Sequence, residues 1–258
     1  LGIAPLTSMY LFGENQKAPA DDFRPEVHDS DGLAIYSGTG EWIFRPLVNP
    51  KRLLMSSFAL ANPQGFGLSQ RDRNFDDYQD LESRFERRPG AWVTPLGAWG
   101  EGRIQLVELP TPTEFNDNIV AFWVPTQVPK PRERFQLDYR ISWEMERETR
   151  PPQAFVAQSR RGVGPNHGPN AGIGFVIDFE GPALRSLPRN APFDAVVTLD
   201  GNADLLEQVV YRNEVTGGAR LTLRLRRRDD AKPVEMRAFL TQDGATMSET
   251  WSYLLPPD

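Results

Sequence analysis

Four ionisable side chains lie close together near the start of the chain, in the run RPEVHDSDGL at 24–33. Glu26, His28, Asp29 and Asp31 lie within six consecutive positions. A carboxyl group near other carboxyl groups in a partly desolvated cleft has a raised pKa and can donate a proton near neutral pH. The run is therefore a candidate acid/base site. The alternative is a charged turn, in which Asp29 or Asp31 binds its own backbone.

The same run lacks the spacing of a metal-binding loop. Aligned with an EF-hand, it places Val27 at the first ligand position and Gly38 where a bidentate Glu is needed. Zinc requires three or four N, S or O ligands, and the chain has no cysteine and only two histidines, His28 and His167. We therefore expect no metal and no other cofactor.

Aromatic residues downstream of this run are candidates for binding sugar rings. Trp92 and Trp99 flank a Pro/Gly-rich loop in WVTPLGAWGEG, and Tyr78 precedes them. Rings of this kind can pack against the apolar face of a sugar while a polar edge binds its hydroxyls. With the carboxylates of the first run, they favour a carbohydrate site. The alternative is that the two tryptophans are core residues.

Composition sets the class of fold that must position these residues. The chain has 258 residues with 23 Pro and 21 Gly, which favours many short strands joined by turns over long helices. The net charge of −6 argues against a nucleic-acid partner. No apolar run approaches the roughly 20 residues that a membrane span needs. We expect an all-β protein that does not span a membrane.

The distribution of apolar residues predicts two β-rich regions. Residues 1–125 contain several strand-like runs and one expected helix at 76–88, and a Pro-rich linker follows at 126–133. In the region 134–258, apolar residues first alternate over 134–145, as in a strand with one buried face. Seven or so strands in this second region predict an immunoglobulin-like β-sandwich. The expected strands are Thr7–Phe12, Leu33–Tyr36, Trp42–Pro46, Leu53–Leu60, Arg103–Leu109, 134–145, 171–179, 194–199, 205–212, 219–227, 234–241 and 247–254.

Several long blocks of the chain resemble one protein family. They are LGIAPLTSMYLFGENQ, DFRPEVHDSDGL, RRPGAWVTPLGAWGEGRIQLVELPT, DNIVAFWVP and MSETWSYLLPP, in this order. Together they resemble the periplasmic osmoregulated glucan biosynthesis proteins MdoG/OpgG and OpgD over nearly the whole chain. The resemblance implies the C-terminal portion of a large glucan-handling β-sandwich, followed by an immunoglobulin-like domain.

The resemblance also implies a function. Relatives of this kind are periplasmic and act on β-1,2-linked glucan, some of them as inverting hydrolases. It assigns the general acid to Asp29, with Glu26 and His28 in the same cleft as catalytic and substrate-binding residues, and it places the general base upstream of residue 1. Tyr78, Trp92 and Trp99 are the expected sugar-binding rings. The alternative function is a non-catalytic glucan-binding or scaffolding protein that assists a membrane glucan synthase.

Overall fold

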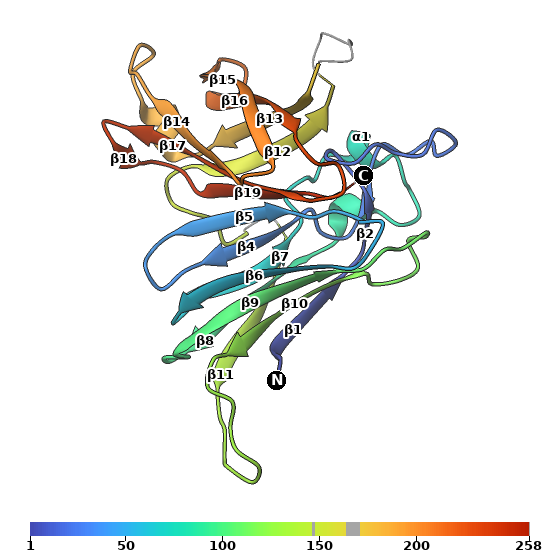
Figure 1. The fold of residues 1–258 in the computed structure, drawn as a ribbon, viewed down its shortest axis with the longest axis vertical. Helices are drawn as coiled ribbons and strands as arrows, with labels where there is room; N and C mark the ends of the chain where they lie inside the picture. The colour runs from blue at the N-terminus through green and yellow to red at the C-terminus, as the bar shows by residue number, and fades with distance from the viewer. Residues whose placement is uncertain (146–147, 164–170, 258) are drawn as a thin grey trace. The chain divides into compact units, whose positions relative to one another are not determined.

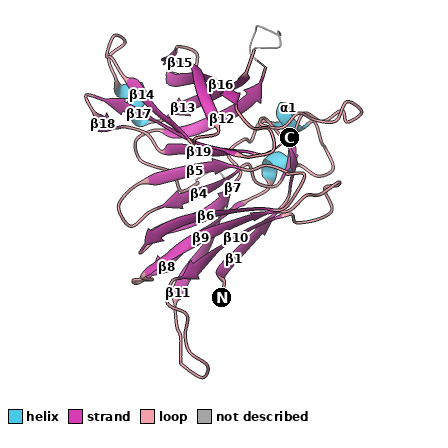
Figure 2. Ribbon diagram, in the orientation of Figure 1, coloured by secondary structure: helices cyan, strands magenta, loops and turns pink. Residues whose placement is uncertain are grey.

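A computed structural model describes residues 1–145, 148–163 and 171–257, so His167 lies outside the described residues. The chain divides into two compact units. Strands dominate both units and the helices are short, which confirms the all-β prediction (Figures 1 and 2). Unit 1 comprises Leu1–Gly13, Lys17–Trp42 and Leu47–Thr149, and unit 2 comprises Glu14–Gln16, Ile43–Pro46 and Arg150–Asp258.

Unit 1 contains two antiparallel four-stranded arrays. The first has the order β1 (Ile3–Ser8), β10 (Ile119–Pro125), β9 (Glu101–Glu108) and β6 (Leu54–Ala61). The second has the order β11 (Asp138–Glu144), β8 (Gly90–Leu96), β7 (Gly65–Ser69) and β4 (Gly32–Tyr36). Burial alternates along β10, where Ile119, Ala121 and Trp123 are inaccessible to solvent and the intervening residues are half-buried. This is the period expected of a strand with one face in a core.

A short ladder in unit 1 carries the acidic run. Strand β2 (Tyr10–Phe12) pairs antiparallel with β3 (Val27–His28). Met9, Phe12 and Val27 from this part of the chain form a buried cluster with Tyr78 and Phe85. The cluster therefore fixes the position of β3 through side chains that come from three separate segments.

The helix expected at 76–88 is wrong. The structure has instead one helical turn, α1 (Phe75–Tyr78), and one 3₁₀ turn, η1 (Phe85–Arg87). The Asp80 carboxylate accepts hydrogen bonds from the amides of Glu82 and Ser83 at 2.9 and 2.8 Å, which gives this segment a side-chain acceptor in place of the helical carbonyls.

Tyr78, Leu81 and Phe85 recur at helical spacing in the sequence, but they do not form one buried face. Tyr78 and Phe85 are buried, but Leu81 between them is 76% exposed. The two buried rings belong to two separate turns that reach the same cluster, so the spacing in sequence did not reflect one helical face.

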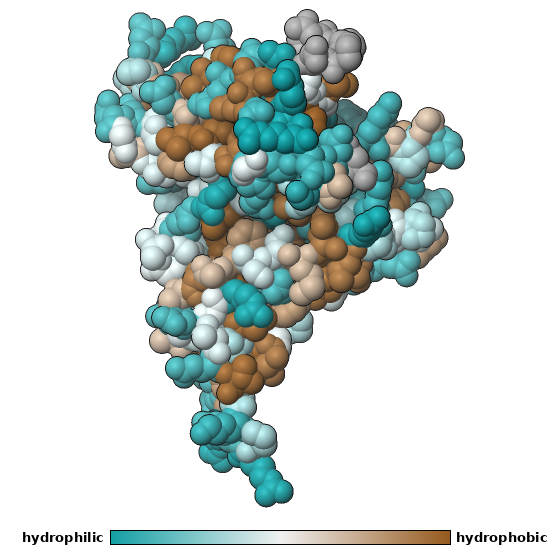
Figure 3. Space-filling view, in the orientation of Figure 1, coloured by the Kyte–Doolittle hydropathy of each residue, from teal (hydrophilic) through white to brown (hydrophobic). Residues whose placement is uncertain are grey.

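The alternating strand expected at 134–145 exists as β11, but it pairs with β8 and lies in unit 1. The contacts therefore extend unit 1 to Thr149, past the linker expected at 126–133. Tyr139, Ile141 and Trp143 are 39%, 38% and 72% exposed, so the expected buried face is not buried within the described part of unit 1. Figure 3 shows apolar patches among polar side chains on the visible face of this unit.

Unit 2 is a β-sandwich of two arrays. One has the order β12 (Phe155–Gly162), β13 (Ile173–Glu180), β16 (Gly218–Arg227) and β15 (Ala203–Asn213). The other has the order β5 (Trp42–Pro46, of which Ile43–Pro46 belong to unit 2), β19 (Thr250–Leu255), β17 (Val234–Gln242) and β14 (Asp194–Leu199), with β18 (Ala245–Thr246) beside β17. A short helix, α2 (Pro182–Ser186), follows β13. Phe175 of β13 contacts the rings of Trp251 and Tyr253 of β19, with centroids 5.6 and 5.2 Å apart, so the core lies between the arrays. Among the described residues, no helix is long and apolar enough to span a membrane.

Two glycines of β7 make room for a tryptophan of β8. A Cβ atom added at Gly65 would overlap the indole of Trp92, and one added at Gly67 would overlap the backbone oxygen of Ala91 and lie 2.8 Å from Cε3 of Trp92. Trp92 is only 5% exposed, and its ring stacks on Trp42 at 5.8 Å. The absence of a side chain at Gly65 and Gly67 is thus a requirement for burying Trp92.

We predict that Gly67→Ala lowers the free energy of unfolding by about 1–3 kcal/mol, because the methyl group overpacks this contact. Gly162→Ala in β12 is the control, since a Cβ atom there meets nothing within 4 Å. Chemical denaturation measures both variants. Equal stability of the two would contradict the packing described for Trp92.

Candidate functional site

Backbone hydrogen bonds within unit 1 hold the acidic run at Asp29 and at Asp31. The amide of Asp29 donates to the carbonyl of Met9 at 2.9 Å, and the amide of Asp31 donates to the carbonyl of Ser69 at 2.8 Å. Between them, Ser30 accepts a hydrogen bond from the Ser8 hydroxyl at 2.8 Å. The run is therefore an ordered segment, which bends at Asp29 and Asp31 between β3 and β4.

His28 lies at the centre of a buried polar network. Its side chain is 1% exposed, and its Nδ1 and Nε2 atoms lie 2.9 Å from Gln70 Oε1 and 2.7 Å from Glu26 Oε2. The side-chain nitrogen Nε2 of Gln70 donates to the carbonyls of His28 and Phe85 and to the hydroxyl of Tyr78. Oε1 of Gln70 is therefore the acceptor for the Nδ1 proton of His28.

The contact between Glu26 and His28 then requires one proton between Nε2 and the carboxyl oxygen, because both groups would otherwise act as acceptors. Burial lowers the pKa of His28, while the nearby Asp31 carboxylate opposes that shift. Glu26 itself is 7% exposed. Both residues were expected in a substrate cleft, and the structure instead buries them against each other, behind Asp29.

Two tyrosines enclose the imidazole of His28. Tyr10 stacks on it with ring centroids 5.3 Å apart, and Tyr78 contacts it edge-on at 5.1 Å. Tyr78 is inaccessible to solvent, its hydroxyl donates to the carbonyl of Asp72, and burial raises its pKa. Tyr78 was expected to bind sugar, but its burial leaves no ring face for a ligand. It acts here as a support for His28.

The tryptophans expected to bind sugar are buried as well. Trp92 and Trp99 are each 5% exposed. The indole nitrogen of Trp99 donates to the carbonyl of Asp138 at 3.1 Å, and its ring lies 5.9 Å from Trp123 and 6.0 Å from Tyr139. The structure does not bring these rings to Asp29, and their burial fits the alternative of core residues.

Asp29 differs from Glu26 and His28 because it remains accessible. Its side chain is 30% exposed, and Oδ1 lies 3.2 Å from Nε of Arg88. This buried oxygen accepts no hydrogen bond from the described residues. Burial raises the pKa of Asp29, Arg88 lowers it, and the charges of Asp117 and Glu114 raise it further. The group is thus a carboxyl with a raised pKa that still reaches solvent.

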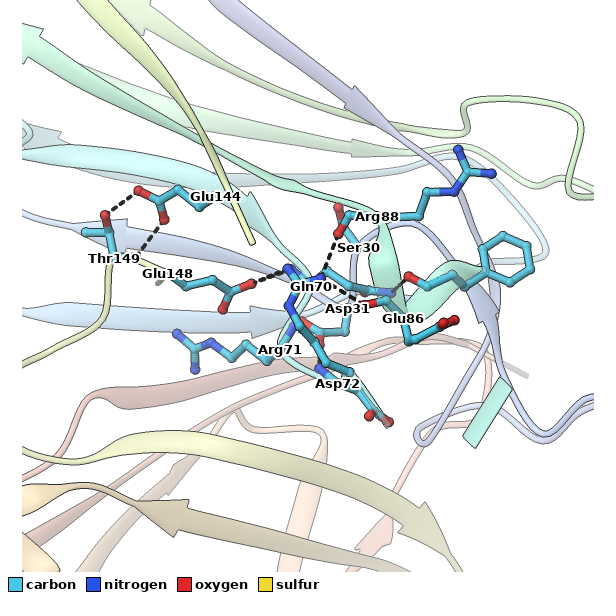
Figure 4. Close-up of polar contacts among 12 residues, drawn as sticks. Ser30, Asp31, Gln70, Arg71, Asp72, Glu86, Arg88, Glu144, Glu148 and Thr149 are labelled. Carbon is cyan, nitrogen blue, oxygen red and sulfur yellow. Dashed lines mark hydrogen bonds and ion pairs between the residues drawn. The ribbon is translucent and has the colours of Figure 1, made fainter. Parts of the chain in front are cut away.

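Asp31 has a structural role that the sequence did not reveal. Its Oδ2 atom accepts hydrogen bonds from the amides of Arg71 and Asp72 at 2.5 and 2.8 Å, and burial raises its pKa to about 7. These amides belong to the segment that directly follows β7. Asp31 therefore fixes the backbone immediately after Gln70, whose side chain belongs to the network around His28 (Figure 4). The carboxylate of Glu148 accepts a hydrogen bond from the backbone amide of Gln70 at 3.2 Å, and its charge adds to the rise in the pKa of Asp31.

Gln70 and Arg88 are the residues that sequence reasoning missed as parts of this site. Gln70 is a polar residue directly after an apolar strand, which is a signal that could have drawn attention to it. Arg88 was the last residue of the helix expected at 76–88 and had no expected role in the site.

We predict that Gln70→Leu lowers the free energy of unfolding by several kcal/mol, because it leaves buried groups on His28, Phe85 and Tyr78 without their partner at roughly 1–3 kcal/mol each. The control is Gln136→Leu, which changes an exposed glutamine whose side chain bonds only an exposed carboxylate. Denaturant unfolding compares the two. A small loss for Gln70→Leu would contradict the network.

We also predict that Asp31→Asn becomes more stable relative to wild type as the pH rises from 4.5 to 8. The folded pKa of about 7 lies above the ordinary value of 3.8, so folding retains a proton that the unfolded chain releases. Wild-type stability therefore falls between these values by up to roughly 1.4 kcal/mol per pH unit, whereas the amide does not titrate. Urea unfolding at several pH values measures the difference, and a pH-independent difference would contradict this prediction.

Comparison with known proteins places the chain in a family. The family model for the periplasmic glucan biosynthesis protein MdoG matches residues 1–255. The chain is 56% identical over 263 residues to the glucans biosynthesis protein G of Ralstonia nicotianae (strain ATCC BAA-1114 / GMI1000). That alignment covers 100% of this chain and 52% of the relative, so the chain spans about half the length of the relative. The chain belongs to the MdoG family of periplasmic glucan biosynthesis proteins.

Proposed function

We propose that the protein acts in the periplasm on the β-1,2-linked backbone of a glucan, as an inverting glycoside hydrolase in which Asp29 is the general acid. The observation that carries this proposal is the Asp29 carboxyl, which has a raised pKa and remains partly exposed. Family membership supports a glucan as the substrate class.

The proposed step is protonation of the glycosidic oxygen. Asp29 gives its proton to this oxygen as the bond to the anomeric carbon breaks, and water adds to that carbon from the opposite face of the ring. A second carboxylate must take a proton from the water, and we expect this base upstream of residue 1. The products are an α-anomeric reducing end and a free hydroxyl on the leaving sugar.

The surroundings of Asp29 suit this role. A general acid must hold its proton near the working pH, and burial together with the charges of Asp117 and Glu114 favours the protonated form. After proton transfer, the guanidinium of Arg88 stabilises the carboxylate that is left. The buried pair of Glu26 and His28 supports the backbone from which Asp29 projects and does not itself need to contact the sugar.

Asp29→Asn tests the proposal directly. We predict that it lowers the rate of hydrolysis of linear β-1,2-glucan by about 100-fold or more, because the general acid is lost, while the glucan still binds. Product chromatography and anomeric NMR measure the rate and the stereochemistry. Unchanged turnover in Asp29→Asn would contradict the assignment.

Binding of the glucan without cleavage by the wild-type protein would support the other function considered, a binding or scaffolding protein that assists a membrane glucan synthase. In that case, the acidic run would be a recognition segment.

The pH profile gives a second test of Asp29. We predict that Arg88→Gln moves the alkaline limb of the hydrolysis profile to higher pH, because Arg88 lowers the pKa of Asp29 and its removal lets the acid keep its proton longer. Arg87→Gln is the matched control on the adjacent exposed arginine. An alkaline limb that stays in place or moves to lower pH in Arg88→Gln would contradict the assignment.

A further inference from the structure

A second feature of unit 1 has the form of a binding site. The end of β2 and two loops, 19–24 and 112–115, line a pocket with a volume of about 500 Å³. This volume lies in the range of sites for small molecules. The loops are far apart in the sequence, so the fold must hold them together to make the pocket.

Two phenylalanines on these loops are unusually exposed. Phe23 is 78% exposed and Phe115 is 87% exposed, and each lines the pocket from a different loop. A large apolar side chain left in water forgoes about 25 cal/mol for every Å² that burial would remove. Exposed rings on two sides of one pocket are therefore typical of a surface that becomes covered when a ligand binds.

An arginine on the loop 19–24 connects this loop to the loop 112–115 through an ion pair. The Arg24 guanidinium makes ion pairs with Asp22 at 2.9 Å, with Asp80 at 3.1 Å and with Glu114 at 2.7 Å. Asp22 lies on the same loop as Phe23, and Glu114 directly precedes Phe115. The hydrogen bond from Arg24 lowers the pKa of Asp22, which keeps this carboxylate charged as an acceptor. The ion pairs therefore pre-organise the two rings.

The pocket adjoins the strand pair that leads to Asp29, because Leu11 and Phe12 of β2 line it and β2 pairs with β3, which ends one residue before Asp29. Glu114 lines the pocket, and its charge contributes to the raised pKa of Asp29. Asp117, two residues after Phe115, has the same effect and accepts a hydrogen bond from the Thr7 hydroxyl at 2.8 Å. A glucan chain that binds at Asp29 is therefore the ligand that we consider for this pocket.

We propose that this pocket is a subsite for glucose units of the β-linked glucan that lie away from the bond at Asp29, with Phe23 and Phe115 as its two sugar-binding rings. Apolar ring faces and ionised carboxylates together match the apolar faces and hydroxyl groups of a neutral hexose. The ligand class rests on the proposed function. The site itself rests on the pocket, the exposed rings and the ion pairs that hold them.

The test is binding of linear β-1,2-gluco-oligosaccharides of increasing length, measured by calorimetry in the Asp29→Asn background so that no cleavage occurs. Phe115→Ala and Phe23→Ala should each raise the Kd for long oligosaccharides about tenfold and leave the Kd for the shortest binding oligosaccharide unchanged. Leu81→Ala is the matched control, because Leu81 is 76% exposed in the same unit and does not line the pocket. Phe115→Tyr should retain the wild-type Kd.

Thermal unfolding checks that each variant folds, and the exposed positions predict an unchanged Tm. Equal Kd values for long oligosaccharides in wild type, Phe115→Ala and Phe23→Ala would overturn the subsite. A loss of affinity at every length would also overturn it, because the rings would then act at the bond itself. Asp29→Asn separates the two proposals: full hydrolysis in that variant contradicts the general acid, and the KM values of Phe115→Ala and Phe23→Ala for long and short oligosaccharides then test the subsite by the same length dependence.

Discussion

The proton held between Glu26 and His28 is the interaction on which the candidate site depends. Neither group can be buried alone without a large desolvation cost, and each is placed where the other satisfies it. Gln70 orients the imidazole, and Tyr10 and Tyr78 enclose it. Because all of these contacts are internal, they fix a backbone segment and do not form a surface for substrate.

Asp29 gains its properties from that arrangement. It directly follows His28, where the chain bends at the end of β3, and its side chain lies beside Arg88 and partly in solvent. The same segment continues to Asp31, which binds the two amides after Gln70 and closes the network. One short run thus contains residues of two kinds, those that hold the backbone and one that is available for chemistry.

The sequence predicted much of the fold, because strand periodicity and turn residues are local signals. Trp42–Pro46 and the strand at 194–199 coincide with β5 and β14. It did not predict β7 or β8. The two glycines of β7 are atypical of a strand, and they are required there only because Trp92 of β8 packs over them. The helix expected at 76–88 failed for a related reason. Side-chain capping by Asp80 is a specific contact that a count of apolar spacing does not include.

The site was predicted in its location and not in its division of roles. The types of residue at 24–33 predicted an acid/base site there. They could not distinguish Glu26 and His28, which are buried, from Asp29, which is accessible. Long-range partners decide this difference, because Gln70 and Arg88 lie far along the chain. Aromatic residues were assigned by type as well, whereas Trp92, Trp99 and Tyr78 are buried and the rings that line the pocket, Phe23 and Phe115, are exposed.

The fold raises the pKa of Asp29 while leaving its side chain partly exposed. Titration of the Asp29 side-chain carboxyl by ¹³C NMR, with Asp29→Asn used to assign its signal, measures this property without substrate. We predict a midpoint above the ordinary aspartate value of 3.8, with a further rise in Arg88→Gln. A midpoint at or below the ordinary value would contradict it, because the carboxyl would then have no proton to donate near neutral pH.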